Sequence, residues 1–305
     1  MPAIPAPSLV LRGRTIDLTE PVLMGIVNAT PDSFSDAGDY PDTAARVARA
    51  VELLAEGARI IDVGGQSGIT GVPEVAADEE IARVVPVVEG IVAAAPDALI
   101  SVDTYKPPVV QAVLEAGAAI VNDVSGLLYP EVAGLCAAAG AGLVVMHNRS
   151  KPKQRLTDPL LYDDVTGDVV DVLAAKLAEV EAAGVPRASV LLDPGPDFSK
   201  TPHQTVTVLR EIDRVRALGR PLLLALSRKD FLGAITGRPP KQRLAGTLAA
   251  VGHLAGRPGY VLRVHDVVAV ADYLAVASVL AGRSELAADA ELPVELRREP
   301  ARREA

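Results

Sequence analysis

Polar residues end a series of short apolar runs in this sequence, and their types suit a flat heterocycle. Asp103, Asn122 and Asp193 supply carboxylate and amide oxygens at three of these ends. A carboxylate beside an amide can bind an amine and a ring N–H that lie side by side, as in a 2-amino-4-oxo-pyrimidine. Other run ends carry Asn28, Asp62, His147, Ser227, Lys229, Arg263 and His265.

The last two runs supply the residues for an anion. Lys229, Arg263 and His265 are hydrogen-bond donors or cations. Arginine grips phosphate with two parallel hydrogen bonds, and lysine adds a point charge. Asn28 offers an oxygen that could ligate Mg²⁺. Any one of these residues could merely cap a helix or a turn, but their number favours a site for a base-like ring joined to phosphates.

Apolar runs alternate with amphipathic stretches, which predicts alternating strands and helices. The runs lie at residues 22–28, 59–65, 98–103, 119–126, 142–147, 189–195, 221–227 and 260–266. Eight such units predict an α/β fold, a single (β/α)₈ or TIM barrel, in which the carboxyl ends of the strands carry the active site. A Rossmann-like open sheet is the alternative, but no GxGxxG motif follows the first strand.

The chain divides into three predicted parts. Residues 1–20 form an N-terminal segment with a β-hairpin at 8–18, which could cover the floor of the barrel. Residues 21–282 form the barrel. Residues 283–305 mix charges of both signs and are expected to be a solvated, partly disordered tail.

Composition excludes several classes of function. A formal net charge of -9 argues against non-specific binding of nucleic acid or of an anionic membrane surface. No apolar run reaches the ~18 residues of a membrane helix, and the N-terminus does not resemble a signal peptide. We therefore expect a cytoplasmic protein with no nucleic-acid or membrane partner. The single cysteine, Cys136, lies in an Ala-rich stretch and is expected to be a buried structural thiol.

Seven segments resemble the signature segments of dihydropteroate synthases, in the same order, between about residues 20 and 282. They are MGIVNATPDSFSDAGDY (24–40), ISVDTYKP (100–107), NDVSG (122–126), LDPGPDFSKT (192–201), LSRKDFLG (226–233), RLAGTLAA (243–250) and LRVHD (262–266). The resemblance implies a TIM-barrel transferase of folate biosynthesis. It would join 6-hydroxymethyl-7,8-dihydropterin diphosphate to p-aminobenzoate, use Mg²⁺ and form a homodimer.

The resemblance also implies a role for each matching residue. The pterin ring would be held by Asp103, Asn122, Met146, Asp193 and Lys229. The diphosphate would be held by Asn28, Arg263 and His265, with Asn28 as the metal ligand. The acceptor side would comprise Phe34, Asp36, Ser67, Phe198 and Asp230, and Thr30 to Asp36 would form a mobile loop. The catalytic residues would be Asp103, Lys229, Arg263 and His265, which stabilise the leaving diphosphate and a pterin cation shielded from water.

The sequence departs from the family pattern mainly on the acceptor side. The second loop reads GGQSGITG (64–71) where the family has close to GGESTRPG, so Ile69 replaces a cation. Asp230 replaces a serine expected near the carboxylate of p-aminobenzoate, and Ala225 replaces a glycine near the pterin plane. Three alternatives therefore stay open: a paralogous transferase with another amine acceptor, a pterin-binding protein without transferase activity, and a corrinoid-type methyltransferase. The intact segments at 226–233 and 262–266 disfavour the last.

Overall fold

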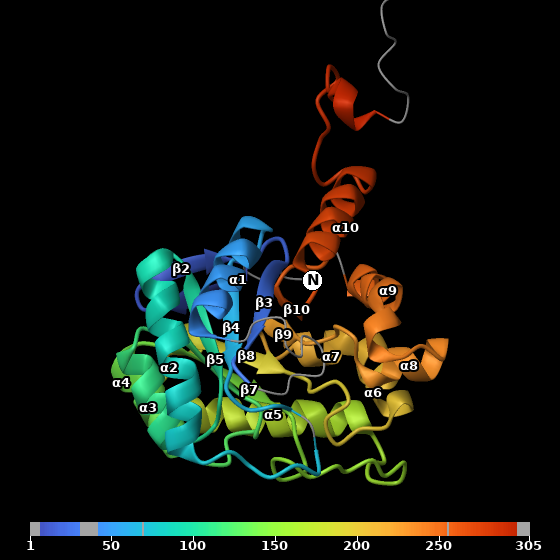
Figure 1. Ribbon diagram of the computed structural model, residues 1–305. Helices are drawn as coiled ribbons and strands as arrows, with labels where there is room; N and C mark the ends of the chain where they lie inside the picture. Colours follow the sequence, from blue (N-terminus) through green and yellow to red (C-terminus); the bar gives the residue numbers. More distant parts are fainter. Residues whose placement is uncertain (1–6, 31–41, 69, 255, 298–305) are drawn as a thin grey trace, which may run out of the picture.

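The computed structural model describes residues 7–30, 42–68, 70–254 and 256–297. Within this part of the chain, eight parallel strands form a closed barrel surrounded by helices (Figure 1). The strand order is β10-β3-β4-β5-β6-β7-β8-β9, and β10 closes the barrel by pairing in parallel with β3. The predicted (β/α)₈ barrel is confirmed, and the Rossmann-like open sheet is excluded.

The strands lie where the apolar runs predict them. The barrel strands are β3 (Val22–Asn28), β4 (Ile60–Gly64), β5 (Leu99–Asp103), β6 (Ile120–Asp123), β7 (Gly142–Met146), β8 (Val190–Asp193), β9 (Leu222–Leu224) and β10 (Tyr260–Val264). The helices are α1 (Thr43–Ala55), α2 (Ala77–Ala94), α3 (Pro107–Glu115), α4 (Glu131–Ala139), α5 (Val165–Ala182), α6 (Pro202–Arg210), α7 (Ile212–Arg216), α8 (Asp230–Thr236), α9 (Leu244–Leu254) and α10 (Val267–Leu280). Short 3₁₀ turns occupy Arg187–Ser189, Pro240–Gln242 and Val294–Leu296.

The pleat of each strand divides the apolar side chains between two cores. Leu23 and Val27 of β3 belong to the outer core, where α1 contributes Leu53. Met24 belongs to the inner core, together with residues of several other barrel strands. Parallel strands buried on both faces require this near-continuous apolar sequence, which is why the runs show little alternation.

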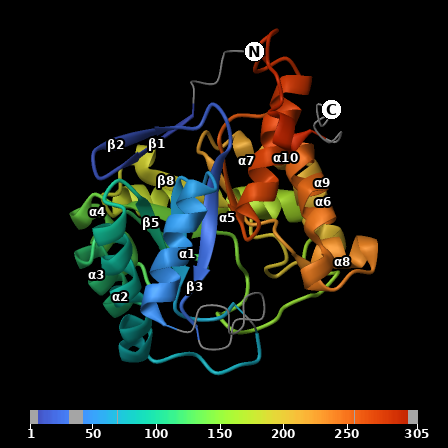
Figure 2. The same cartoon turned by 45° about the horizontal axis from the view of Figure 1, so that its top comes forward.

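An N-terminal hairpin closes the amino end of the barrel, as predicted. Strands β1 (Ser8–Leu11) and β2 (Arg14–Asp17) pair antiparallel, and Figure 2 shows them lying across one end of the barrel. Leu9 and Leu11 are fully buried in the inner core. A Cβ at Gly142 would lie 2.3 Å from Leu11 Cδ2, so only glycine lets β7 approach the hairpin this closely.

Two further expectations concern Cys136 and the tail. Cys136 is fully buried, and burial raises the pKa of its thiol to about 12, which confirms a structural role.

After α10, the side chains described between residues 283 and 297 are exposed. The division of the chain at residues 20 and 282 stays a prediction. No helix among the described residues is long and apolar enough to span a bilayer.

Candidate active site

Inward-facing side chains become more polar from the floor of the barrel to the carboxyl ends of the strands. The pairing register places corresponding residues of neighbouring strands in rows. On β3, β4 and β5 these rows are Met24–Ile60–Leu99, then Ile26–Asp62–Ser101, then Asn28–Gly64–Asp103 at the rim. The apolar floor therefore supports a polar rim at the carboxyl ends of β3, β4 and β5.

Asp62 is the centre of the buried polar layer. Its side chain is fully buried and accepts hydrogen bonds from Arg263 Nε at 2.6 Å and Ser101 Oγ at 2.6 Å. Asn122 Nδ2 donates a third bond at 3.3 Å. A buried carboxylate is tolerated when it is paired and hydrogen-bonded in this way. The sequence placed Asp62 among the strand-end residues without giving it a role.

Arg263 connects the buried layer to the rim. Besides its bond to Asp62, it donates from Nη2 to Asp103 Oδ2 at 3.1 Å. Burial raises the pKa of Asp103; the charge of Arg263 opposes this shift, and the nearby carboxylate of Asp62 adds to it. Arg263 therefore lies between two carboxylates at the predicted pterin end. Its predicted role toward diphosphate stays a prediction.

Asn122 presents an acceptor to the barrel interior. The residue is 1% exposed, and its Oδ1 has no hydrogen-bond partner among the described residues. Nearly all buried polar atoms in proteins find a partner, so this oxygen suits a ligand N–H. The structure thus places Asn122 beside Asp62 and next to Asp103, with which its Cα is paired across β5 and β6.

Asp193 and Met146 form the next part of the rim. They are paired across β7 and β8, and both are nearly fully buried. Asp193 Oδ1 accepts from the backbone N–H of Gly195 at 2.7 Å. Burial raises the pKa of Asp193 above the usual range of an aspartate. Gly195 has φ +64°, and a Cβ there would lie 2.2 Å from His147 O, so the turn after β8 requires glycine.

Lys229 and Phe198 face each other beside Asp193. Lys229 Nζ lies 4.4 Å from the centroid of the Phe198 ring, a cation–π distance. Burial lowers the pKa of Lys229, opposed by the carboxylates of Asp197 and Asp193. The structure therefore brings the predicted pterin residue Lys229 together with the predicted acceptor residue Phe198.

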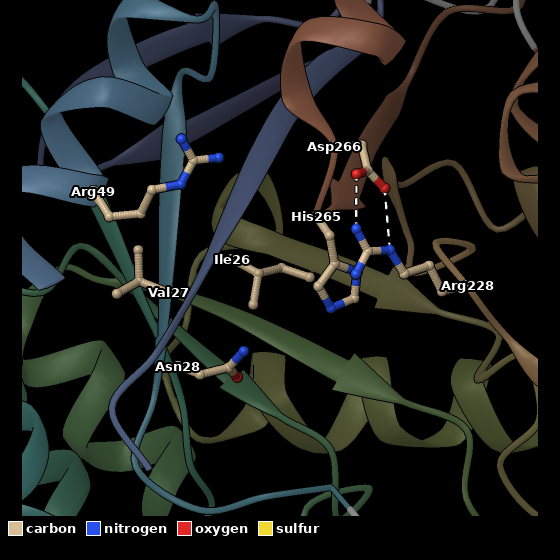
Figure 3. Close-up of a pocket in the computed structure, with 7 residues that line it drawn as sticks. All are labelled: Ile26, Val27, Asn28, Arg49, Arg228, His265 and Asp266. Carbon is tan, nitrogen blue, oxygen red and sulfur yellow. Dashed lines mark hydrogen bonds and ion pairs between the residues drawn. The ribbon is translucent and has the colours of Figure 1, made fainter. Parts of the chain in front are cut away.

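A pocket on the β3 and β10 side contains the other predicted anion ligands. Asn28 and His265 line it together with Arg228 and Asp266, as Figure 3 shows. Arg228 pairs with Asp266 through bonds of 2.7 and 3.2 Å. The predicted residues Asn28 and His265 are thus brought together. Arg228 was missed, although it precedes Lys229 in the segment 226–233 that carries the resemblance.

His265 acts here as a neutral group. Burial, together with repulsion from Arg228 and Arg263, lowers the pKa of its imidazole to about 3. Nδ1 lies 3.0 Å from Ser227 Oγ. Burial thus disfavours the cationic form, and the predicted role of His265 toward diphosphate stays a prediction.

The acceptor side is only partly described. Phe34 and Asp36 lie outside the described residues. Ser67 lies in the second loop, where its carbonyl oxygen accepts from Nζ of Lys153. Gly71 N–H also donates to Lys153 O at 3.1 Å, so the loop after β7 packs on the second loop. A lysine from another loop is therefore brought to the loop that lacks its own cation.

Asp230 does not point freely toward the acceptor side. Its carboxylate lies 3.0 Å from Arg243 Nη1, and its side chain is 61% exposed. The first N–H groups of α8 are capped by another residue, Asp197, whose Oδ2 accepts from the backbone of Asp230 at 2.6 Å. At the position where the family pattern has a serine, the carboxylate of Asp230 is therefore paired with Arg243.

Metal ligands are sparse in the described residues. No group of three or more His, Cys, Asp or Glu side chains in this part of the chain could hold a metal ion. Asn28 therefore stands as a single predicted oxygen ligand near His265 in the same pocket.

Comparison with known proteins places this site in a family. Residues 24–265 match the family described as "Pterin binding enzyme". Dihydropteroate synthase of Escherichia coli K12 is 38% identical over 259 residues, which cover 85% of this chain and 91% of that protein. A probable bifunctional folylpolyglutamate synthase/dihydropteroate synthase of Haloferax volcanii is 43% identical over 248 residues, 80% of this chain but only 29% of that longer protein.

A solved structure agrees with both the sequence and the fold. Dihydropteroate synthase of Xanthomonas albilineans with 4-aminobenzoic acid superposes with a TM-score of 0.82 at 40% identity, covering 90% of this chain and 98% of that chain. The polar rim described above lies within the matched residues 24–265. The chain belongs to the dihydropteroate synthase family of pterin-binding transferases, which act in folate biosynthesis.

Proposed function

We propose that this site condenses 6-hydroxymethyl-7,8-dihydropterin diphosphate with p-aminobenzoate and releases diphosphate. The observation that carries the proposal is the buried polar layer, in which Asp62, Arg263 and Asp103 are joined by hydrogen bonds at the carboxyl end of the barrel. Such a preorganised layer suits a planar, N–H-rich ring better than an apolar ligand. The pocket of Asn28 and His265 adjoins it on β3 and β10.

The pterin ring is held by acceptors from three strands. Asp193 accepts from the amine and ring N–H of the heterocycle, while Asn122 Oδ1 accepts a further N–H. Met146 packs against the ring face, where its polarisable thioether suits an aromatic system. Asp103, held by Arg263, adds a carboxylate oxygen at the same rim.

The reaction breaks the bond between the pterin methylene and the diphosphate oxygen and forms a bond to the amine nitrogen. The electron pair of the broken bond leaves with diphosphate, and the attacking amine then loses a proton. Lys229 and Arg263 stabilise the negative charge that develops on the leaving group. The apolar floor keeps water away from the barrel side of the ring, where a cation forms.

The residues present fit Mg²⁺ as the cofactor at the anion end. Mg²⁺ keeps several waters and takes few protein oxygens together with substrate phosphates, so Asn28 alone suffices on the protein side. Bound there, the ion would neutralise charge on the diphosphate oxygens. His265 donates a hydrogen bond to the same group.

Substitutions should separate the anion end from the ring end. We expect His265→Ala to weaken binding of the diphosphate form by about 10- to 100-fold and to spare the bare pterin, since a hydrogen bond to a charged group is worth ~1.5–3 kcal/mol. Arg263→Ala should weaken both ligands, because Asp62 and Asp103 lose their partner. Calorimetry with the pterin bearing and lacking diphosphate measures both effects. Equal losses for both ligands in His265→Ala would contradict this division.

On the acceptor side, Arg243 should offset the extra carboxylate. We expect Asp230→Ser to change KM for p-aminobenzoate by less than about fivefold, because an exposed ion pair is worth ~0.2–1 kcal/mol. Arg243→Gln exposes the unpaired carboxylate and should raise KM for p-aminobenzoate more than KM for a neutral arylamine. A much lower KM in Asp230→Ser would show instead that Asp230 repels the substrate.

One assay separates the proposal from its alternatives. Diphosphate release and dihydropteroate formation are measured with and without p-aminobenzoate. Release that depends on p-aminobenzoate supports the proposal, and release with only another amine identifies a paralogous transferase. Pterin binding without release indicates a binding protein, and methyl transfer to a corrinoid protein indicates a methyltransferase.

We also infer a cytoplasmic homodimer. Helix α10 is apolar along most of its length and exposes Val276 at 59% and Leu280 at 83% of their surface. Figure 1 shows this helix at the edge of the barrel. Apolar side chains grouped on one exposed helix favour a symmetric contact with a second copy. Sedimentation of the wild type and of a Val276→Glu, Leu280→Glu variant tests this, with a monomer expected for the variant.

A further inference from the structure

A buried lysine lies beneath the loop that carries Phe198. Lys200 is 2% exposed, and its Nζ donates to Gly195 O at 3.0 Å and Phe198 O at 3.1 Å. The third contact, at 2.7 Å, is with His147 Nδ1. An ammonium group has three N–H donors, so these three acceptors satisfy it.

Burial lowers the pKa of Lys200 to about 7, opposed by the carboxylates of Asp193 and Asp168. The polar groups behind Lys200 fix the tautomer of His147. His147 Nε2 lies 2.8 Å from Asp168 Oδ2, and Arg149 pairs with the same carboxylate. Because Nδ1 accepts from Lys200, the imidazole proton lies on Nε2 and is donated to Asp168. Burial, together with repulsion by Lys200, lowers the pKa of His147 to about 4, in agreement with a neutral ring.

The loop above Lys200 has an uncommon backbone. Asp197 has φ +65° and Ser199 has φ +49°, both in the left-handed region that side chains disfavour. Such conformations persist only when surrounding contacts over-determine them. Two of these contacts come from Lys200, and another is the bond of 2.7 Å from Tyr162 OH to Ser199 O.

This loop holds Lys229 from two directions. The ring of Phe198 lies 4.4 Å from Lys229 Nζ. Asp197 Oδ2 accepts the backbone N–H of Asp230 at 2.6 Å and so fixes the start of α8, directly after Lys229. The conformation of residues 195–199 therefore sets where the ammonium of Lys229 lies.

We propose that Lys200 is a positioning residue for Lys229. Its amino group holds residues 195–199 in the conformation, left-handed at Asp197 and Ser199, that places Phe198 and Asp197 against Lys229. Lys200 itself does not contact the substrate, because it lies beneath the loop. The inference rests on the proposed function for the role of Lys229, and it adds the group that orients this residue.

A double-mutant cycle tests the proposal. Lys200→Met keeps an unbranched apolar chain and removes the three hydrogen bonds, and Lys229→Met removes the charge at the site. Each single variant should lower kcat/KM by about tenfold or more. The kcat/KM of the double variant should lie within about twofold of that of Lys229→Met. If the losses in kcat/KM of the two single variants multiply in the double variant, Lys200 is merely structural and the proposal is overturned.

Two more variants make the result independent of folding. Thr201→Ala removes the side-chain cap of α6 next to Lys200 and leaves the loop contacts in place, so its kcat/KM should stay within about twofold of wild type. If Lys200→Met does not fold, Tyr162→Phe removes a single contact to the same loop. It should lower kcat/KM in the wild type and have no effect in the Lys229→Met background, and an equal effect in both backgrounds would contradict positioning.

Pterin affinity is a second measurement, and it does not depend on the transferase reaction. The same cycle, measured by calorimetry with the bare pterin, should show the same lack of additivity. A wild type that binds pterin but forms no dihydropteroate would overturn the proposed function and leave this inference tested by binding alone.

Discussion

Asp193→Asn is expected to weaken binding of the bare pterin by about 2–4 kcal/mol, a loss of roughly 30- to 1,000-fold in affinity. The carboxylate is nearly fully buried at the end of β8, where Oδ1 accepts from Gly195. Asparagine keeps the size of the side chain but can present an N–H where the ring also presents one. The ligand would therefore lose a charged acceptor and meet an unpaired donor. Calorimetry with a pterin that lacks phosphates isolates this contact.

A matched control lies on the neighbouring side of the barrel. Asp123 is also a fully buried carboxylate at a strand end, with Ser125 as its hydrogen-bond donor. It follows the inward-facing Asn122, so the pleat directs its side chain toward the helices. Asp123→Asn should change pterin affinity by less than about twofold. Similar losses in both variants would mean that Asp193 stabilises the barrel rather than binding the ring.

The sequence predicted the barrel because local patterns determine most of it. Short apolar runs alternate with amphipathic stretches, and glycines such as Gly140 close the helices in the left-handed conformation. Strand ends could therefore be located from the sequence, and with them Asp103, Asn122 and Asp193. The hairpin was also readable, because Arg12-Gly13 separates two short apolar segments.

Partners that meet through barrel closure could not be predicted in the same way. Asp62 and Arg263 are separated by 201 positions, and no local pattern indicates that their side chains meet. The ion pair of Asp230 with Arg243 likewise depends on how the segment after β9 folds back. His265 shows the same limit, since its pKa is set by burial, which the residue type does not reveal.

Asp62→Asn should be among the most destabilising single substitutions in the barrel. Removing one partner from a buried ion pair typically costs about 3–5 kcal/mol, because the remaining charge is left without compensation. Here the remaining charge is Arg263, which would lose its 2.6 Å bond to Asp62 and keep only the bond to Asp103 at 3.1 Å. Ser101 and Asn122 also donate to this carboxylate and would compete for a weaker acceptor. Urea unfolding at neutral pH measures the loss.

A second substitution distinguishes stability from function in the same layer. In Asp62→Asn, Arg263→Gln neither member of the pair is charged, and burial already favours the neutral form of Asp103. The double variant should therefore be more stable than Asp62→Asn by about 1 kcal/mol or more. Its pterin affinity should stay as low as that of whichever single variant, Asp62→Asn or Arg263→Gln, binds pterin more weakly. The reason is that Arg263 no longer orients Asp103. Unchanged stability in Asp62→Asn would mean that the layer is solvated and that Asp103 alone holds Arg263 in place.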